Sequence, residues 1–167
     1  NQIMPNWCYN YTKITHENPA KIAELISAIE VHKWFSHYLP VPANLIEPTD
    51  PDIAAKGITT MGNAEYNWRV NNWGTKWEIG DVDTNDYSDT MLDLYFETAW
   101  SPPTGVYAAM KEQGYVIESE YWEEGGFFVG HWIDGLDESF KPEDAPSELS
   151  HLVAHTHFLS LIHISEP

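Results

Sequence analysis

The feature that most constrains this chain is a strict alternation of side chains along Thr90–Thr98. One set of alternate positions holds Leu92, Leu94, Phe96 and Thr98, and the other holds Asp93, Tyr95 and Glu97. Successive side chains of a β-strand point to opposite faces of the sheet, so the segment predicts a strand with one buried and one solvated face. Antiparallel sheets commonly have this arrangement. The rest of the chain must then provide a layer that covers the apolar face.

Two helices are predicted to form that layer. In the first, Asn18 can cap the N-terminus and Pro19 fits the first turn. The residues that follow at helical spacing form an apolar stripe of Ile22, Leu25, Ile26 and Ile29. The second helix is expected to begin at residues 101–103 (Ser-Pro-Pro), and Gly114 stands where a C-terminal cap belongs.

The remaining segments predict further strands and an irregular insertion. Strands are expected over 7–15, 75–82, 115–121 and 127–133, with an extended, proline-broken segment over 34–48 and a polar turn over 83–89. Gly125 and Gly126 supply the positive φ of a tight hairpin between the last two strands. The order β-α-β-β-β-α-β-β predicts an α+β fold, a split β-α-β sandwich with an antiparallel sheet and two helices on one face.

Two regions have weaker patterns. The segment 51–72 is mixed and predicts short helices around Gly57 and Gly62, so we expect an irregular insertion over about 48–74. After residue 134 the alternation fades. The stretch Lys141–Ser150 is rich in proline and glutamate and predicts a tail or linker.

Composition excludes several classes of protein. The chain has 167 residues, of which 43% are hydrophobic, and a formal net charge of −18. No apolar run approaches the roughly 20 residues that cross a bilayer, and no signal-peptide pattern occurs, so we expect an intracellular protein without a membrane segment. The single cysteine, Cys8, excludes an internal disulfide and cysteine-clustered metal sites. The excess of carboxylates disfavours non-specific binding to nucleic acid.

The negative charge is concentrated in one part of the chain. Residues 1–76 hold seven acidic and six basic residues, whereas residues 77–150 hold eighteen acidic residues against Lys111 and Lys141. One explanation is a solvated acidic face that maintains solubility. The other is a surface that attracts a protein partner with a basic surface. The candidate residues for that surface are Asp93, Glu97, Glu118, Glu120, Glu123 and Glu124.

Tryptophans gather in two short motifs that could form a ligand or partner site. The candidate residues are Trp73, Gly74, Thr75, Lys76, Trp77, Thr98, Trp100 and Ser101. Indole rings could stack on a base or another ring while Lys76 holds a phosphate or carboxylate. The alternative is that these residues form core architecture, with Lys76 over an indole as a cation–π pair.

Other possible chemistry has weaker support. The segment 81–86 begins like an EF-hand calcium loop, but Asp86 and Leu92 replace the required glycine and glutamate, which favours a solvated turn. His151, His155 and His157 have a spacing that can bring two imidazoles to a metal. Cys8 lies within an aromatic strand and is expected to be buried and inert. We predict no metal site and no cofactor, and no known catalytic motif identifies catalytic residues.

Four motifs occur in order along the chain: MPNWCYN at 4–10, NWGTKW at 72–77, FETAWSPP at 96–103 and YWEEGGF at 121–127. Together they resemble the Api92-like/YubB family of phages, plasmids and integrated elements. The resemblance covers roughly residues 4–133. It implies a ferredoxin-like fold and a mobile-element protein in the cytoplasm of a bacterial host, and it implies no established activity. The fold name refers to topology, because one cysteine cannot ligate an iron–sulfur cluster through four thiolates.

The ends of the chain are expected to lie outside this domain. Residues 159–167 resemble the in-frame translation of a common transposase sequencing adapter, and Met4 is the expected start of the native protein. We therefore expect a ferredoxin-like domain over 4–133, an acidic C-terminal tail or extension over 134–158, and adapter-derived sequence over 159–167. The alternative is that the apolar run 159–164 forms a real final strand.

These observations favour a binding protein over an enzyme. The leading hypothesis is a mobile-element accessory protein that contacts a basic partner through its acidic surface and inhibits a host defence or DNA-processing factor. The second is a small-ligand or nucleotide-binding domain, with or without turnover, at the tryptophan motifs. The third is RNA binding, because RNA-recognition modules share the split topology and stack bases on sheet aromatics such as Tyr9 and Tyr95.

Overall fold

The computed structural model of this protein describes residues 6–46 and 62–156 and contains a six-stranded sheet. The strands are β1 (Trp7–Thr15), β2 (Val82–Ser88), β3 (Met91–Ala99), β4 (Val116–Glu123), β5 (Val129–Ile133) and β6 (Leu136–Phe140). They lie in the order β2-β3-β1-β4-β5-β6, and every neighbouring pair is antiparallel. The prediction of an α+β fold with an antiparallel sheet is confirmed.

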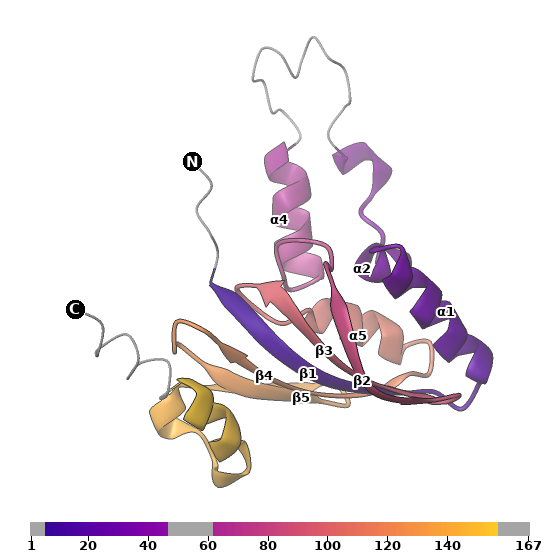
Figure 1. The fold of residues 1–167 in the computed structure, drawn as a ribbon. Coiled ribbons are helices and arrows are strands. Elements are labelled where there is room, and N and C mark those ends of the chain that lie inside the picture. The colour runs from indigo at the N-terminus through magenta and orange to yellow at the C-terminus, as the bar shows by residue number, and fades with distance from the viewer. Residues whose placement is uncertain (1–5, 47–61, 157–167) are drawn as a thin grey trace.

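Helices pack against one face of this sheet, which we call the helix-covered face (Figure 1). They are α1 (Pro19–Glu30), α2 (Trp34–Tyr38) and α5 (Thr104–Lys111). The helix α4 (Gly62–Asn72) extends away from one end of the sheet, and the short helix η1 (Ala43–Leu45) precedes it along the chain. None of the helices in the described ranges has both the length and the apolar content that a bilayer crossing requires.

The opposite face of the sheet, which we call the outer face, is covered at one end by the C-terminal part of the chain. This part contains η2 (Pro142–Asp144), η3 (Ser147–Leu149) and a helical turn over 150–156. Leu149 and Leu152 are buried there against Trp122 and Val129 of the sheet. Both faces of the sheet are therefore covered, one by the helices and the other, over a smaller area, by the C-terminal part of the chain (Figure 1).

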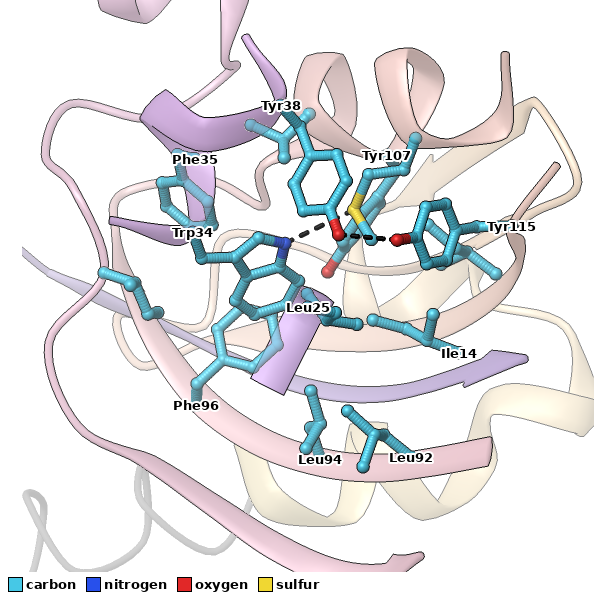
Figure 2. Packing of buried hydrophobic residues seen from close by; sticks show 14 of the residues in the cluster. Ile14, Leu25, Trp34, Phe35, Tyr38, Leu92, Leu94, Phe96, Tyr107 and Tyr115 are labelled. Atoms are coloured by element: carbon cyan, nitrogen blue, oxygen red, sulfur yellow. Dashed lines mark hydrogen bonds between the residues drawn. The ribbon is translucent and has the colours of Figure 1, made fainter. Parts of the chain in front are cut away.

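The main core lies between the helix-covered face and its helices. Alternate residues of β3 enter it, as the sequence predicts, and Leu92, Leu94, Phe96 and Thr98 are all buried. Trp34 of α2 is fully buried, and its indole Nε1 donates a hydrogen bond to the Met110 sulfur at 3.3 Å (Figure 2). Nearby, the hydroxyls of Tyr38 and Tyr115 lie 2.6 Å apart (Figure 2). Buried aromatic rings are therefore a large part of this layer, packed among aliphatic side chains.

Polar side chains of β1 are buried in the same layer and bond to both neighbouring strands. The Asn10 amide donates to the Phe96 carbonyl at 3.2 Å and to the Thr98 hydroxyl at 3.0 Å. The Thr12 hydroxyl lies 2.9 Å from that of Ser119 and 3.1 Å from that of Tyr107. Buried polar groups must find such partners, because each unsatisfied group costs about 1–3 kcal/mol.

The predicted start of the first helix is confirmed, but the predicted set of buried apolar residues is partly wrong. The Asn18 side chain caps α1 by accepting from the Ala20 N–H, and Pro19 is the first helical residue. Ile22 and Leu25 are buried, but Ile26 is 37% exposed. The stripe is narrower than expected because Ala28 takes the next buried position.

The predicted strand over 75–82 and turn over 83–89 are both wrong, because β2 occupies Val82–Ser88. The Glu78 carboxylate instead accepts hydrogen bonds from the N–H groups of Phe35 at 3.0 Å and Ser36 at 2.9 Å. A carboxylate at a helix N-terminus satisfies donors that the helix itself leaves unpaired. The polar side chains of β2 suit an edge strand, which pairs on one side and is solvated on the other.

The insertion also differs from expectation. Residues 34–48 were predicted to be extended, but α2 and η1 are helical. The helix expected around Gly62 exists as α4. The helix expected around Gly57 lies outside the described residues, as do Met4, His157 and the adapter-like segment 159–167.

The sheet continues past residue 133, where the sequence pattern fades. Asp134 and Gly135 have φ of 47° and 100°, and Ile133 pairs with Leu136 across them. Two residues with positive φ form the tight turn that Asp-Gly favours. The proline-rich stretch Lys141–Ser150 contains η2 and η3 and brings Leu149 into a buried position, so it is more than a linker.

A glycine-to-alanine pair tests the packing of α5 against the end of α4. A Cβ on Gly105 would lie 1.6 Å from the Asn72 carbonyl oxygen, whereas one on Gly80 would meet nothing within 4 Å. We expect Gly105→Ala to lower the free energy of unfolding by about 3 kcal/mol or more. Gly80→Ala should change it by less than about 0.5 kcal/mol. Urea denaturation of both variants measures this, and equal stabilities would contradict the packing.

The buried Tyr107 predicts a loss of stability at alkaline pH. Burial raises the pKa of its hydroxyl above its usual value of about 10. The unfolded chain ionises first, so the stabilising contribution is complete below pH of about 10 and is lost as the pH rises beyond it. Tyr107→Phe should cost about 1 kcal/mol near neutral pH. Its deficit relative to the native protein should shrink above pH of about 10 in denaturation experiments; a constant deficit would contradict the assignment.

Candidate functional site

The outer face of the sheet places charged and aromatic side chains in rows across three strands. The register puts Lys13 between Asp93 and Glu118, Tyr11 between Tyr95 and Glu120, and Tyr9 between Glu97 and Trp122. Because β1 is the central partner of both β3 and β4, its outward residues stand next to side chains of both strands. Four of the predicted acidic residues, Asp93, Glu97, Glu118 and Glu120, are thereby brought to one face.

A groove of about 720 Å³ lies on this face, beside the C-terminal helical turn. Its charged and titratable lining residues are Lys13, Asp93, Glu118, Glu120, His131, Glu148, His151 and His155. Four carboxylates therefore face the groove against one ammonium group. We call this feature the acidic groove.

Histidines join the C-terminal helical turn to the sheet. The His151 Nε2 is hydrogen-bonded to the Glu120 carboxylate. The His155 ring stacks on Trp122, with ring centroids 5.1 Å apart and an interplanar angle of 7°. Both histidines therefore contact the sheet from the same side of the turn, and these packing contacts explain their spacing.

Three carboxylates of the acidic groove remain available to a ligand. Within the described ranges, the ion pairs include Glu120 but not Asp93, Glu118 or Glu148. On the same face, burial first and then the Glu97 carboxylate raise the pKa of the Tyr95 hydroxyl above its usual value. A cation that enters the groove would meet three carboxylates that form no ion pair within the described chain, with Lys13 as the one ammonium group beside them.

The last two residues predicted for the acidic surface, Glu123 and Glu124, lie outside the acidic groove. Glu123 is 2% exposed, so the prediction that it lies on the surface is wrong. It pairs across the sheet with Cys8 on the helix-covered face, and its Oε2 accepts the Phe127 N–H at 3.1 Å. Glu124 accepts a hydrogen bond from the Trp7 N–H. Both carboxylates serve the hairpin around Gly125 rather than the acidic groove.

The structure also bears on the reactivity of Cys8 and on metal binding. Cys8 is fully buried as predicted, and burial raises the pKa of its thiol well above the usual range, which suppresses the nucleophilic thiolate. Asp83 and Asp86, part of the calcium-like segment, lie on the edge strand β2. Among residues 6–46 and 62–156, no group of three or more histidine, cysteine, aspartate or glutamate side chains could hold a metal ion.

Most residues of the tryptophan motifs hold the chain in place. Trp73 is buried, and its Nε1 donates to the Leu39 carbonyl at 2.7 Å. The remaining bonds connect the two motifs: the Thr75 hydroxyl donates to the Ala99 carbonyl, the Thr98 hydroxyl to the Ser101 carbonyl, and the Ser101 hydroxyl to the Gly74 carbonyl. For Trp73, Gly74, Thr75, Thr98 and Ser101, the contacts are those of core architecture.

The other three residues of these motifs form a different arrangement. The Lys76 ammonium lies 4.8 Å from the ring centroid of Trp77, 4.9 Å from that of Trp100 and 5.5 Å from that of Tyr66. The predicted cation–π pair is therefore confirmed, with two further rings. We call the three rings of Tyr66, Trp77 and Trp100 the aromatic cage. Trp77 and Trp100 are 40% and 47% exposed, so the cage opens to solvent.

The backbone at Trp100 is in an unusual conformation. Its φ is 71°, in the left-handed region that bulky side chains rarely adopt. Its N–H donates to the Asn6 carbonyl at 2.9 Å, which holds the residue in this position. Such strain costs of the order of 1–3 kcal/mol and persists only where the surrounding structure imposes it.

Sequence reasoning missed several residues of both sites. Tyr11, Lys13 and His131 line the acidic groove, and the alternation along 7–15 could have placed the first two on its outer face. His131 and Glu148 reach the groove only because β5 and the C-terminal turn fold against the sheet. Tyr66 belongs to α4, ten residues before Lys76, and no local pattern connects the two.

Comparisons with known proteins identify no relative whose function could inform this site. A scan against protein-family models finds no match for this chain, and searches of curated proteins and of solved structures find none either. The site is therefore argued from its own geometry.

The strain at Trp100 can be measured with two substitutions. Trp100→Ala and Trp100→Gly both remove the indole, but only glycine adopts positive φ without a steric penalty. We expect Trp100→Gly to be more stable than Trp100→Ala by about 1 kcal/mol. Denaturation with urea gives the difference. If alanine were as stable as glycine or more so, the left-handed conformation would be incorrect.

Proposed function

We propose that this protein is a binding protein that holds a basic segment of a partner protein in the acidic groove. The observation that carries the proposal is the convergence of Asp93, Glu118, Glu120 and Glu148 around one hollow of the outer face. Elsewhere on the surface, carboxylates in water contribute little to an interaction. In a hollow, low-dielectric walls concentrate the field of several like charges and attract a ligand of opposite charge.

The surroundings of the groove suggest the character of the partner. Val116, Ile133 and Leu136 are 50%, 46% and 62% exposed. The register places Ile133 opposite both Glu118 and Leu136, so apolar side chains adjoin the carboxylates. A segment that carries arginine or lysine together with apolar residues would match both features.

The strand order supports a ferredoxin-like assignment as part of this proposal. The order β2-β3-β1-β4, with α1 between β1 and β2 and α5 between β3 and β4, has the connectivity of a split β-α-β sandwich. In that interpretation, β5 and β6 extend the sheet and support one side of the groove. The resemblance to the Api92-like/YubB family adds a mobile-element setting in the bacterial cytoplasm, where the partner would be a host defence or DNA-processing factor.

The alternative functions have less support from the geometry. RNA binding would use the outward rings of Tyr9, Tyr11 and Tyr95, but the register places Glu97 and Glu120 beside them. Carboxylates repel phosphates, and RNA-binding sheets supply cations at these positions. A nucleotide at the tryptophan motifs would need free polar groups, yet the hydroxyls of Thr75, Thr98 and Ser101 already donate to backbone carbonyls.

A charge-matched pair of variants tests the proposed function. The groove variant carries Asp93→Asn, Glu118→Gln and Glu148→Gln, and the control carries Glu17→Gln, Glu30→Gln and Glu112→Gln at exposed positions elsewhere. The probe is a fluorescent peptide of alternating arginine and leucine, and anisotropy measures its dissociation constant at several salt concentrations. We expect the groove variant to bind at least about tenfold more weakly, because three facing charges are lost. The control should change by less than about threefold.

The two variants have the same net charge, which makes the outcome decisive. If both lose affinity equally, the peptide responds only to the overall charge of −18 and the acidic groove is not its site. If neither loses affinity, the electrostatic basis of the proposal is wrong. We expect the affinity for the peptide to fall more steeply with salt concentration for the native protein than for the groove variant.

A further inference from the structure

The aromatic cage is a second feature of the surface that the proposed function does not use. The Lys76 ammonium is held by three ring faces at 4.8–5.5 Å. Among the ion pairs of the described chain, none includes Lys76, although the protein has 26 carboxylate residues. We propose that the aromatic cage is a binding site for a quaternary ammonium group and that Lys76 is its resident, displaceable occupant.

Hydrogen bonds connect the backbone segments that carry the walls of the cage. They come from three separate segments: α4, the loop after it, and the turn after β3. The Arg69 side chain joins the first two by donating to the Lys76 carbonyl at 2.7 Å while its guanidinium pairs with Glu65. The Ser101 hydroxyl joins the last two through the Gly74 carbonyl. A site whose geometry is fixed in advance loses little conformational entropy when it binds a ligand.

Exposure and strain distinguish the cage from core packing. Trp73, which has a structural role, is 2% exposed, whereas Trp77 and Trp100 are 40% and 47% exposed. Indoles that remain about half exposed gain less burial energy than the fully enclosed Trp73 does, so packing explains their presence less well. Trp100 also occupies the left-handed region, where an indole is sterically unfavourable. Strained residues concentrate at sites of binding and catalysis.

Charge decides between a cationic and an anionic ligand. The protein carries a formal charge of −18, which attracts cations and repels anions. One carboxylate is connected to the cage through Trp7: Glu124 accepts the N–H of Trp7, whose ring centroid is 6.2 Å from that of Trp77. Ring faces themselves present negative potential to a cation. All three features favour a positively charged group in the cage.

The occupant determines which cation can replace it. A primary ammonium such as that of Lys76 is compact and strongly hydrated, and its flexible stem can return it to water. A quaternary ammonium carries its charge on methyl groups, which contact ring faces without giving up hydrogen bonds to water. Aromatic cages are the recurrent receptors for this group. The proposed ligand class is therefore a trimethylammonium compound, and the site is independent of the acidic groove.

Choline and its neutral isostere 3,3-dimethylbutanol test this site by isothermal titration calorimetry of the full chain. Lys76→Met removes the resident charge and keeps a side chain of similar length. We expect this variant to bind choline about tenfold more tightly than the native protein, because no internal cation competes. The neutral isostere should bind neither protein measurably. Adding Trp77→Leu to Lys76→Met should abolish choline binding, since one wall of the cage is lost.

The proposal fails if Lys76→Met binds choline no more tightly than the native protein, or if the isostere binds equally well. Resistance of the Cys8 thiol to labelling reports that each variant is folded, because that thiol is fully buried in the native chain. A parallel titration with Nε-trimethyllysine shows whether a free small molecule or a modified side chain is preferred. The groove variant of the preceding section should bind choline normally, so failure here and failure of the basic-partner function are distinguishable.

Discussion

The register of β1 between β3 and β4 is the constraint on which the rest of this structure depends. Each residue of β1 from Cys8 onward has a fixed partner on both sides, such as Thr12 opposite Leu94 and Ser119. A slip of one residue would move every side chain of the strand to the other face. Buried hydrogen bonds oppose such a slip, because Asn10 and Thr12 would leave their partners unsatisfied.

The same register creates the face that carries the acidic groove. With Asn10 and Thr12 turned inward, Tyr9, Tyr11 and Lys13 must point outward, where they meet side chains of both neighbouring strands. The acidic rows of β3 and β4 then lie on either side of β1 instead of being spread over two faces. The C-terminal helical turn closes one side of the resulting hollow. Core packing and the candidate site are thus two consequences of one strand pairing.

Local patterns predict those elements whose residues interact mainly with near neighbours in sequence. The alternation along β3 and the cap of α1 by Asn18 follow from local rules and are found in the structure. The second helix is found as α5, but it begins at Thr104 rather than at the predicted residues 101–103. The failures occur where a distant residue decides the outcome. The short helix α2 depends on Glu78, more than forty residues later, and polar β2 becomes a strand because β3 offers it an edge. The hairpin of Asp134 and Gly135 is an exception, since the Asp-Gly pair is itself a local turn signal and both residues have positive φ.

The sequence by itself determined the class of fold, the burial of Cys8, the concentration of negative charge after residue 76 and the pairing of Lys76 with an indole. These properties depend on composition, on the period of alternation or on adjacent residues. Only the tertiary structure decided that Glu123 is buried, that four carboxylates share one groove and that Tyr66 completes the aromatic cage. The physical reason is that a site is a set of side chains close in space. Which segments become neighbours is determined by strand order and helix packing, and local sequence carries no direct record of either.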